Sequence, residues 1–435
     1  MAKVFREWSV EQRWLLPPSV QELVPADHLS HFVRELVREQ LDLTSIYASY
    51  GEERGQPPFH PAMMTALLLY AYCQGVYSSR RIARACEERI DFIAVTALNR
   101  PDFRTIAKFR VRHLDALGGL FKQVLRICQR AGLVQLGHVA LDGTKVNANA
   151  SKHKAMSYGR MKEAERKQAE EIARWFAEAD ATDAREDQEH GDRRGDELPE
   201  WVANKQTRLA KIREAKAALE AEAREKDKDA KKSGGGGNSG GSEDPKPANK
   251  TQRNFTDPES RIMHTRGGFV QAYNAQLAVD AAHQIIVAQS LNALQSDSGE
   301  LPSIVAQIRE NTGRNPTELS ADNGYFSAEN IRVLKRRQIR GYLAPGRERH
   351  NDGDRSKSHT RYTMRLCREM AARVRRGGHR SRYRLRKFTV EPVHGQIKEC
   401  RGFRRFSLRG TKKVRGEWTL ICTVHNLLKL ARQRK

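Results

Sequence analysis

The β-rich segments of this chain fall into two groups, separated by a polar stretch at residues 155–254. The first group is "GHVALDGTKVNANAS", in which residues 138–146 read as a buried strand. The second group holds "GGFVQAYNAQLAVD" and "HQIIVAQSL", then the helical pattern "SGELPSIVAQIREN" and the short strand "TELSADNGYF". Three strands, a helix and a further strand predict a mixed α/β sheet whose first strand is joined to the others across an insertion.

The insertion is rich in Glu, Ala, Lys and Arg and is broken at "HGDRRGDELP", which predicts a helical hairpin. Widely spaced apolar residues could form a narrow seam between its two arms: Ile172, Trp175, Phe176, Leu209, Ile212 and Leu219. The following "KKSGGGGNSGGSEDPKP" has the composition of a flexible linker. Neither piece carries obvious chemistry.

The N-terminal part, residues 1–133, has helical patterns throughout, with Pro61 suited to a first helical turn and Gly132 to a helix end. In "RPDFRTIAKFRVRHLDAL", Arg104, Lys108 and Arg112 recur every four residues and form a basic helix face. Such a face is usually only solvated. In so basic a chain, with a short helix just upstream, a helix-turn-helix-like DNA reader is an equally good interpretation.

The charge of the chain is strongly positive, at +25 with a pI near 10.0. Residues 361–435 contain 23 Lys and Arg against 4 Asp and Glu, so the excess is concentrated at one end. A merely soluble surface would mix both signs more evenly. Cations that displace counterions from phosphates give strong, sequence-independent binding, so DNA or RNA is the expected partner.

Other bulk properties narrow the cellular context. A mean hydropathy of −0.72 and the lack of a long apolar run argue against a membrane span. The start "MAKVFREWSV" has no signal-peptide pattern, and the six cysteines contain no Cys-x-x-Cys pair. We therefore expect a cytoplasmic protein with no membrane partner.

Two acids stand at unusual places in the predicted sheet. Asp142 interrupts a buried strand, which is costly unless something pairs with the carboxylate. Asp322 occupies an Asp-Asn-Gly corner at a strand end, where open α/β sheets bind ligands. Asp, Asn and Gly also build ordinary turns, so a structural role for Asp322 is the alternative. If the two strands are neighbours, the acids repel each other unless a divalent cation such as Mg²⁺ or Mn²⁺ lies between them.

A third acid occurs in "SRYRLRKFTVEPVHGQIKECRGFRRF". Tyr383, Lys387, Glu391 and Lys398 are spaced four, four and seven apart, which would align them on one face of a continuous helix. Pro392 disfavours helix at the preceding residue, so the helix could instead kink or begin there. An ordinary basic helix with one salt-bridging Glu is the alternative to a catalytic role.

Together these stretches resemble the DDE transposases of bacterial insertion sequences. "LDGTKVNANAS", "SADNGYF" and "EPVHGQIK" match the three acid motifs of that family in order. The last stretch resembles the branch with a Tyr-Arg-Glu-Lys motif, because Lys398 follows Glu391 by seven residues; Arg386 or Lys387 stands at the Arg position. The N-terminal "HPAMMTALLLYAYCQGVYSSRRI" and "RPDFRTIAKFR", together with "GFRRFSLRG" and "HNLLKL" near the end, extend the resemblance over most of the chain outside the insertion.

The resemblance implies an α/β, RNase H-like core with an N-terminal all-helical domain and a helical insertion. It implies that Asp142, Asp322 and Glu391 hold Mg²⁺, with Mn²⁺ as a substitute, and that Lys398 contacts a phosphate. The expected partner is double-stranded DNA, at terminal inverted repeats and at the target, bound by a homo-oligomer in the nucleoid of a bacterium. The expected DNA-binding residues are Arg104, Lys108, Arg112, Tyr383, Lys387, Arg404 and Arg405.

The expected division of the chain is a DNA-binding domain at residues 1–133, the first core strand at 134–154, the insertion and linker at 155–254, and the rest of the core with basic helices at 255–435. Two other functions remain open. One is an RNase H-like nuclease that cuts DNA without joining it. The other is a basic nucleic-acid-binding protein whose acids are structural.

Overall fold

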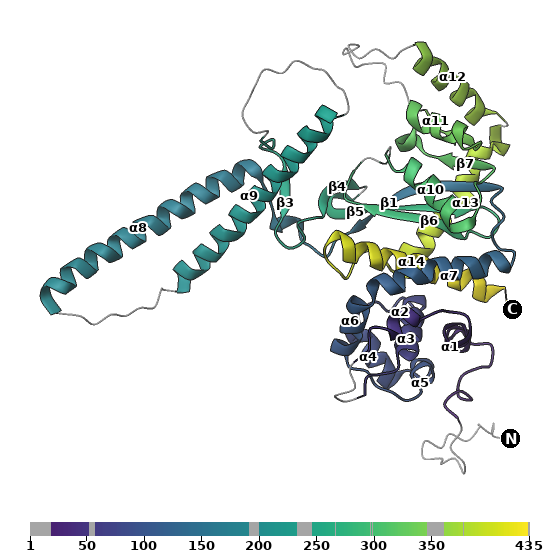
Figure 1. The fold of residues 1–435 in the computed structure, drawn as a ribbon, viewed down its shortest axis with the longest axis horizontal. Coiled ribbons are helices and arrows are strands. Elements are labelled where there is room, and N and C mark those ends of the chain that lie inside the picture. The colour runs from purple at the N-terminus through teal and green to yellow at the C-terminus, as the bar shows by residue number, and fades with distance from the viewer. Residues whose placement is uncertain are drawn as a thin grey trace, which may run out of the picture.

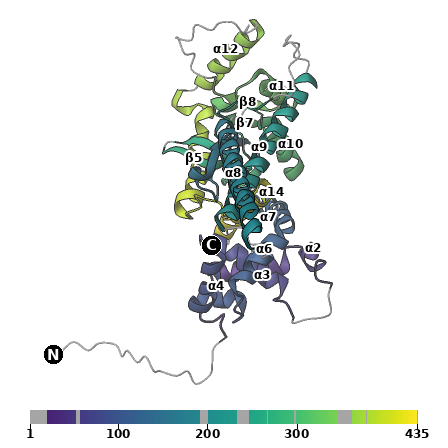
Figure 2. The ribbon, with the colours of Figure 1, turned by 90° about the vertical axis from the view of Figure 1, so that its left-hand side faces the viewer.

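The computed structural model describes residues 19–51, 57–190, 200–232, 246–265, 267–295, 297, 299–345, 361–376 and 378–433. A helical bundle lies at one end, a sheet with flanking helices follows, and a long helical hairpin projects from the side of the sheet (Figure 1). Turning the molecule shows the bundle and α12 (Arg361–Arg375) at opposite ends (Figure 2). No helix in the described ranges is long and apolar enough to cross a membrane.

The N-terminal bundle contains the expected helices. They are α1 (Leu29–Glu39), α2 (Thr44–Tyr47), α3 (Pro61–Cys73), α4 (Ser79–Glu88), α5 (Ile90–Thr96), α6 (Phe103–Arg112) and α7 (Leu114–Arg130). Helix α3 begins with Pro61, whose missing N–H is harmless in the first turn, and it is buried on nearly every side. Gly132 adopts a positive φ of 75° just beyond α7, as expected for a glycine that ends a helix.

The sheet is mixed, as the sequence predicts. Its strands are β1 (His138–Asn147), β4 (Arg261–Thr265), β5 (Gly268–Asp280), β6 (Ile286–Asn292), β7 (Glu318–Ala321) and β8 (Arg340–Leu343). One edge of β5 pairs with β1 and the other with β4 and β6, all antiparallel. On its other edge β1 pairs with β7, and β7 with β8, both parallel. β1 is therefore a central strand, although the insertion separates it from the others in sequence.

Several helices pack against this sheet. α10 (Leu301–Thr312) and α14 (Thr411–Arg432) pack on β6, and α13 (Arg386–Gly395) packs on β1 and β5. α11 (Ala328–Arg336) lies against β8 and is capped by the Ser327 hydroxyl, which accepts a hydrogen bond from Asn330 N–H. α14 also packs along α7, so one apolar core runs from the bundle through the sheet.

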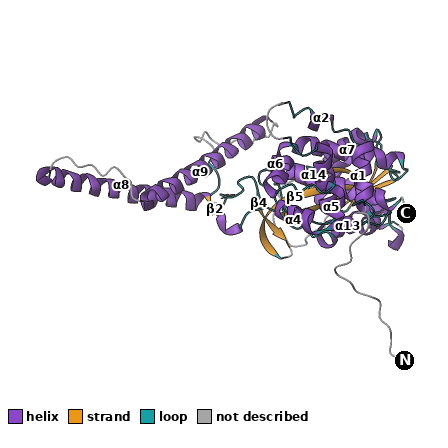
Figure 3. Cartoon of the chain, turned by 90° about the horizontal axis from the view of Figure 1, so that it is seen from below, coloured by secondary structure: helices purple, strands orange, loops and turns teal. Residues whose placement is uncertain are grey.

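The insertion forms the expected helical hairpin, α8 (Tyr158–His190) and α9 (Glu200–Lys232). Its root is a short antiparallel pair, β2 (Ala155–Ser157) with β3 (Gln252–Asn254). Tyr158, Met161, Ile212, Ala215 and Leu219 form a small core separate from the main one. The expected seam residues Ile172 and Leu209 are buried too, whereas the Trp175 and Phe176 side chains and residues 233–245 of the linker lie outside the described part. The hairpin points away from the sheet (Figure 3).

The basic C-terminal segment does not form one continuous α-helix, so the stripe that such a helix would give does not form, and no helix begins at Glu391 either. Residues Arg382–Leu385 form a 3-10 turn, α13 begins at Arg386, and a π-helical turn covers Gln396–Cys400. α13 runs through Pro392, which leaves the Phe388 carbonyl without its usual helical donor. The Gln284 side-chain amide donates to that carbonyl at 2.8 Å, which compensates for the missing bond.

Candidate active site

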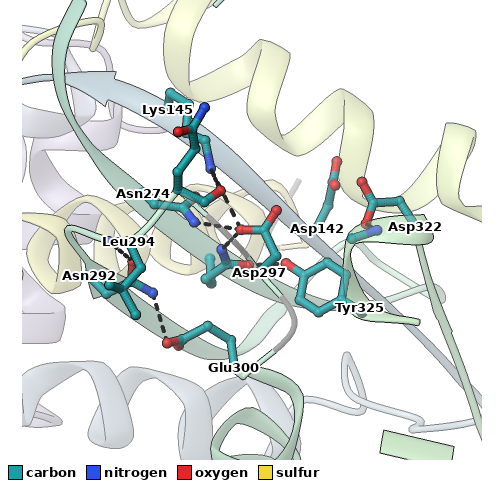
Figure 4. A network of polar contacts seen from close by, with 12 residues as sticks. Asp142, Lys145, Asn274, Asn292, Leu294, Asp297, Glu300, Asp322 and Tyr325 are labelled. Carbon is teal, nitrogen blue, oxygen red and sulfur yellow. Dashed lines mark hydrogen bonds and ion pairs between the residues drawn. The ribbon is translucent and has the colours of Figure 1, made fainter. Parts of the chain in front are cut away.

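Strands β1 and β7 bring the first two acids together. The last paired residues on these parallel strands are Leu141 on β1 and Ala321 on β7. Asp142 directly follows Leu141, and Asp322 directly follows Ala321. Figure 4 shows the two carboxylates side by side. The Asp322 carboxylate also accepts a hydrogen bond from Gly324 N–H at 2.9 Å, so it shapes the corner as the turn interpretation expects. The turn contact does not exclude a second role, because one oxygen can cap the turn while the carboxylate still faces Asp142.

Burial dominates the electrostatics of this pair. Burial raises the pKa of Asp142 to about 6, the Arg386 guanidinium opposes this rise, and the charges of Asp322 and Glu391 add to it. Burial also raises the pKa of Asp322, again opposed by Arg386 and reinforced by Asp297. Two desolvated carboxyls whose pKa values are raised by burial and by nearby acids form a site that favours a bound positive charge.

Arg386 supplies that positive charge in this structure. Its Nη2 lies 3.0 Å from Asp142 Oδ1, and its side chain is only 10% exposed. Its Nη1 donates to the Tyr383 hydroxyl at 3.1 Å. The sequence left Arg386 and Lys387 as alternatives beside the acids, and the structure places Arg386 there and Lys387 in solvent.

Glu391 lies on α13, the helix that packs on β1, and its charge contributes to the raised pKa of Asp142. The side chain is exposed, and no hydrogen bond or ion pair joins it to another described residue. Within the described ranges, no three His, Cys, Asp or Glu side chains are grouped closely enough to enclose a metal ion. The arrangement is thus a half-buried acid pair with a third acid nearby on an adjacent helix.

Two further side chains contact β1: His394 on α13 and Lys398 in the π-helical turn that follows it. The Lys398 ammonium donates to the Thr144 hydroxyl and, at 2.8 Å, to the Lys145 carbonyl, just beyond Asp142 on the same strand. His394 Nε2 lies 3.8 Å from Asp142 Oδ2. Burial lowers the pKa of His394 to about 3, so the imidazole is neutral and this contact is not an ion pair at neutral pH.

Asp297 is a fourth acid at the site, and sequence reasoning missed it. Its Oδ1 accepts hydrogen bonds from Asn274 Nδ2 at 2.5 Å and Gln276 Nε2 at 2.6 Å, both from β5, and lies 3.7 Å from Lys145 Nζ (Figure 4). The sequence held only an indirect hint of a further side chain at this place, because a glycine closely follows both Asp142 and Asp322.

Those two glycines leave room for the Asp297 carboxylate. A Cβ on Gly143 would stand 3.0 Å from Asp297 Oδ1 and 2.7 Å from Gln276 Nε2. A Cβ on Gly324 would stand 3.3 Å from Asp297 Oδ2. Asp297 therefore fits between the strand that carries Asp142 and the corner that carries Asp322.

The remaining predicted DNA-binding residues lie in two places. Arg104, Lys108 and Arg112 are exposed on α6 in the bundle, where Arg112 also covers the Tyr50 ring at 5.0 Å. Arg404 and Arg405 are exposed beside the end of β1, and Arg404 forms an ion pair with Glu399. The α6 face and the acid pair thus belong to different parts of the molecule (Figure 1).

The mixed sheet, with acids on two neighbouring parallel strands and a third on a packed helix, is consistent with an RNase H-like core. Residues 18–112 match the family described as "Transposase domain (DUF772)", and residues 348–431 match "Transposase DDE domain". The two matches support a DDE transposase of an insertion element, and cleavage and strand transfer of DNA is the general function of that family. Enzymes of this family generally depend on divalent metal. No curated protein and no solved structure matches the chain.

The two matched ranges cover different candidate functional residues. The second match includes Glu391 and Lys398, and the first includes the α6 face. Neither match covers Asp142, Asp322 or Asp297, so a role for those acids is argued only from their positions in the sheet and their contacts.

Proposed function

We propose that Asp142, Asp322 and Glu391 hold the divalent metal with which this transposase cuts and joins DNA. The single observation that carries the proposal is the pair of half-buried acids on adjacent parallel strands, balanced by a buried guanidinium. Mg²⁺ is the expected ion and Mn²⁺ its substitute, because hard carboxylate oxygens suit both. When bound, such ions activate the attacking oxygen and neutralise charge on the leaving oxygen.

The residues present fit such an ion. Arg386 already places a cation against Asp142, which indicates that the pocket is electrostatically suited to positive charge. Asp322 keeps an acceptor oxygen beyond the one that caps the turn, and Glu391 is free to turn toward the pair because it has no described partner. Hydrolysis and strand transfer would use the same carboxylates, with water and then a DNA 3′-hydroxyl as the attacking group.

The cations around the acids would position the DNA. Lys398, in the π-helical turn after α13, contacts the stretch of β1 just beyond Asp142 and would contact a phosphate next to the reacting one. Tyr383 and Arg386 form one hydrogen-bonded unit, which supports assignment to the Tyr-Arg-Glu-Lys branch with Arg386 as its Arg. Lys387, Arg404 and Arg405 would add contacts to the phosphate backbone, which carry affinity but no sequence information.

The proposed substrate is the pair of terminal inverted repeats of the element, together with target DNA, bound by a homo-oligomer. The test uses the DNA that flanks the gene. Purified protein should cut a duplex carrying that flank in Mg²⁺ and join the cut end to a second duplex, and EDTA should abolish both reactions. Cutting without any joined product would favour a nuclease, and binding without cutting in Mg²⁺ or Mn²⁺ would favour a non-catalytic protein.

The α6 face leads to a prediction on recognition. Changing Arg104, Lys108 and Arg112 to Ala should weaken binding to the element's ends by about tenfold or more, because base contacts carry specificity. Cleavage of short pre-assembled substrates should fall much less. Competition binding with the end sequence and with random DNA measures the effect. An equal loss on both DNAs would reduce these residues to phosphate contacts.

A further inference from the structure

The root of the α8–α9 hairpin carries a concave surface without acids. Two adjoining hollows share His153, Lys154 and Thr256, and we call their combined surface the root groove. None of the described residues lining it is Asp or Glu. Six of its cationic side chains are Lys152, Lys154, Arg160, Arg208, Lys211 and Arg405. All six are exposed, so the groove presents a concentrated positive charge to solvent.

The groove cations differ from other cations on the same helices. Lys205 pairs with Glu171 at 2.6 Å, and Arg213 and Lys216 pair with Glu165 at 3.2 and 2.8 Å. In the part of the chain that the structure describes, no ion pair reaches any of the six groove cations. Like charges gathered in a hollow without counter-charges repel one another, and a polyanion relieves that repulsion.

The groove begins close to the acid pair. Asn147, the last residue of β1, lines it, and Asp142 lies five positions earlier on the same strand. At roughly 3.3 Å per residue, the two positions are about 17 Å apart. The segment that carries Arg405 is joined to this end of β1, since Asn147 N–H donates to the Arg404 carbonyl at 3.1 Å and Phe406 N–H to the Asn147 carbonyl at 2.9 Å.

We propose that the root groove binds the sugar–phosphate backbone of duplex DNA on one side of the reaction centre. Since the axial rise of B-DNA is about 3.4 Å per base pair, the contact would begin about five base pairs from the reacting phosphate. That distance rests on the proposed function, which places the reacting phosphate at Asp142. The binding itself does not, because it needs only phosphates and the groove cations. The hairpin thus extends the DNA path of the core.

The test compares two fourfold Gln variants on the full chain. The groove variant changes Lys154, Arg160, Arg208 and Lys211, and the matched control changes four ion-paired cations of the same hairpin: Arg166, Lys167, Lys205 and Arg213. Both lose the same charge. Binding of a random-sequence duplex of about 40 base pairs is measured in EDTA over a salt series, which excludes any contribution from metal-bound carboxylates.

The groove variant should bind at least about tenfold more weakly, and its log–log salt slope should be shallower by about 3.6, since each of the four lost phosphate contacts removes roughly 0.9. The control should change binding less than about twofold. Equal losses in both variants, or none in the groove variant, would overturn the proposal. Failure of the carboxylate assignment would show in cleavage and leave these binding results unchanged.

Lysine acylation of the wild-type protein gives a second readout that needs no substitution. Bound random-sequence duplex should protect Lys152, Lys154 and Lys211 from acylation. Lys167 and Lys205, which are ion-paired on the same hairpin, should react equally with and without DNA. Groove lysines that stay reactive at saturating DNA would contradict the proposed path.

Discussion

Asp142→Asn, Asp322→Asn and Glu391→Gln should each lower Mg²⁺-dependent cleavage by about three orders of magnitude or more, while DNA binding persists. Each change keeps the side-chain size and removes one negative charge from the site. The three effects should be similar and far from additive, because the carboxylates act as one unit. Single-turnover cleavage and electrophoretic binding are measured on the same protein preparations.

The control for these variants is Asp115→Asn, which removes a charge from an acid that is 81% exposed and forms an ion pair with the exposed Lys412. It should cleave at the wild-type rate. If any one of the three site variants cuts and joins DNA as fast as the wild type, that residue does not belong to the triad. For Asp322, a wild-type rate would leave only the turn role shown by its bond to Gly324.

Arg386→Met should lower the thermal stability of the metal-free protein more than any other single substitution of a cation at the site. The guanidinium is buried against Asp142, and removing one partner of a buried pair leaves the other uncompensated, at a cost of about 1–3 kcal/mol. Divalent metal should recover part of this loss, because it replaces the missing positive charge. Thermal unfolding with and without Mg²⁺ measures both effects.

The same substitution has a predictable pH dependence. The folded-state pKa of Asp142, about 6, already exceeds the usual value of 3.8, so folding favours the protonated acid and stability falls as pH rises between these values. Arg386 opposes the rise, so its loss should raise the pKa further and extend the decline in stability above pH 6. Lys387→Met, on the exposed neighbour, is the matched control and should melt like the wild type across pH 5–8. An Arg386→Met protein that also melts like the wild type would show that the guanidinium does not balance Asp142.

The sequence predicted the parts of the fold that carry strong local patterns. Alternating or continuous apolar runs located β1, β5, β6 and β7, and the distinct composition of the insertion located the hairpin. β4 and β8 were missed, because each is short and depends on pairing with a neighbouring strand. Pairing energy of that kind comes from residues distant in sequence, so local patterns do not reveal it.

The sequence singled out three acids of the candidate site but not all of the residues around them. Asp142 and Asp322 stood out because a carboxylate is unusual at those places in a sheet. Asp297 lies in a polar loop where an Asp is ordinary, and only β5 amides converging on it give it a role. The single-faced stripe on the third motif failed because 3-10 and π turns flank α13, and these depend on tertiary contacts.

The most direct test of the metal assignment is Asp322→Cys assayed in Mg²⁺ and in Mn²⁺. A thiolate is a softer ligand than a carboxylate, so it suits Mg²⁺ poorly and tolerates Mn²⁺ better. The variant should be nearly inactive in Mg²⁺ and should regain at least about tenfold of its cleavage in Mn²⁺, whereas Asp322→Asn should regain much less. Equal activity of the Cys variant in both ions, whether high or absent, would contradict the assignment of Asp322 as a metal ligand.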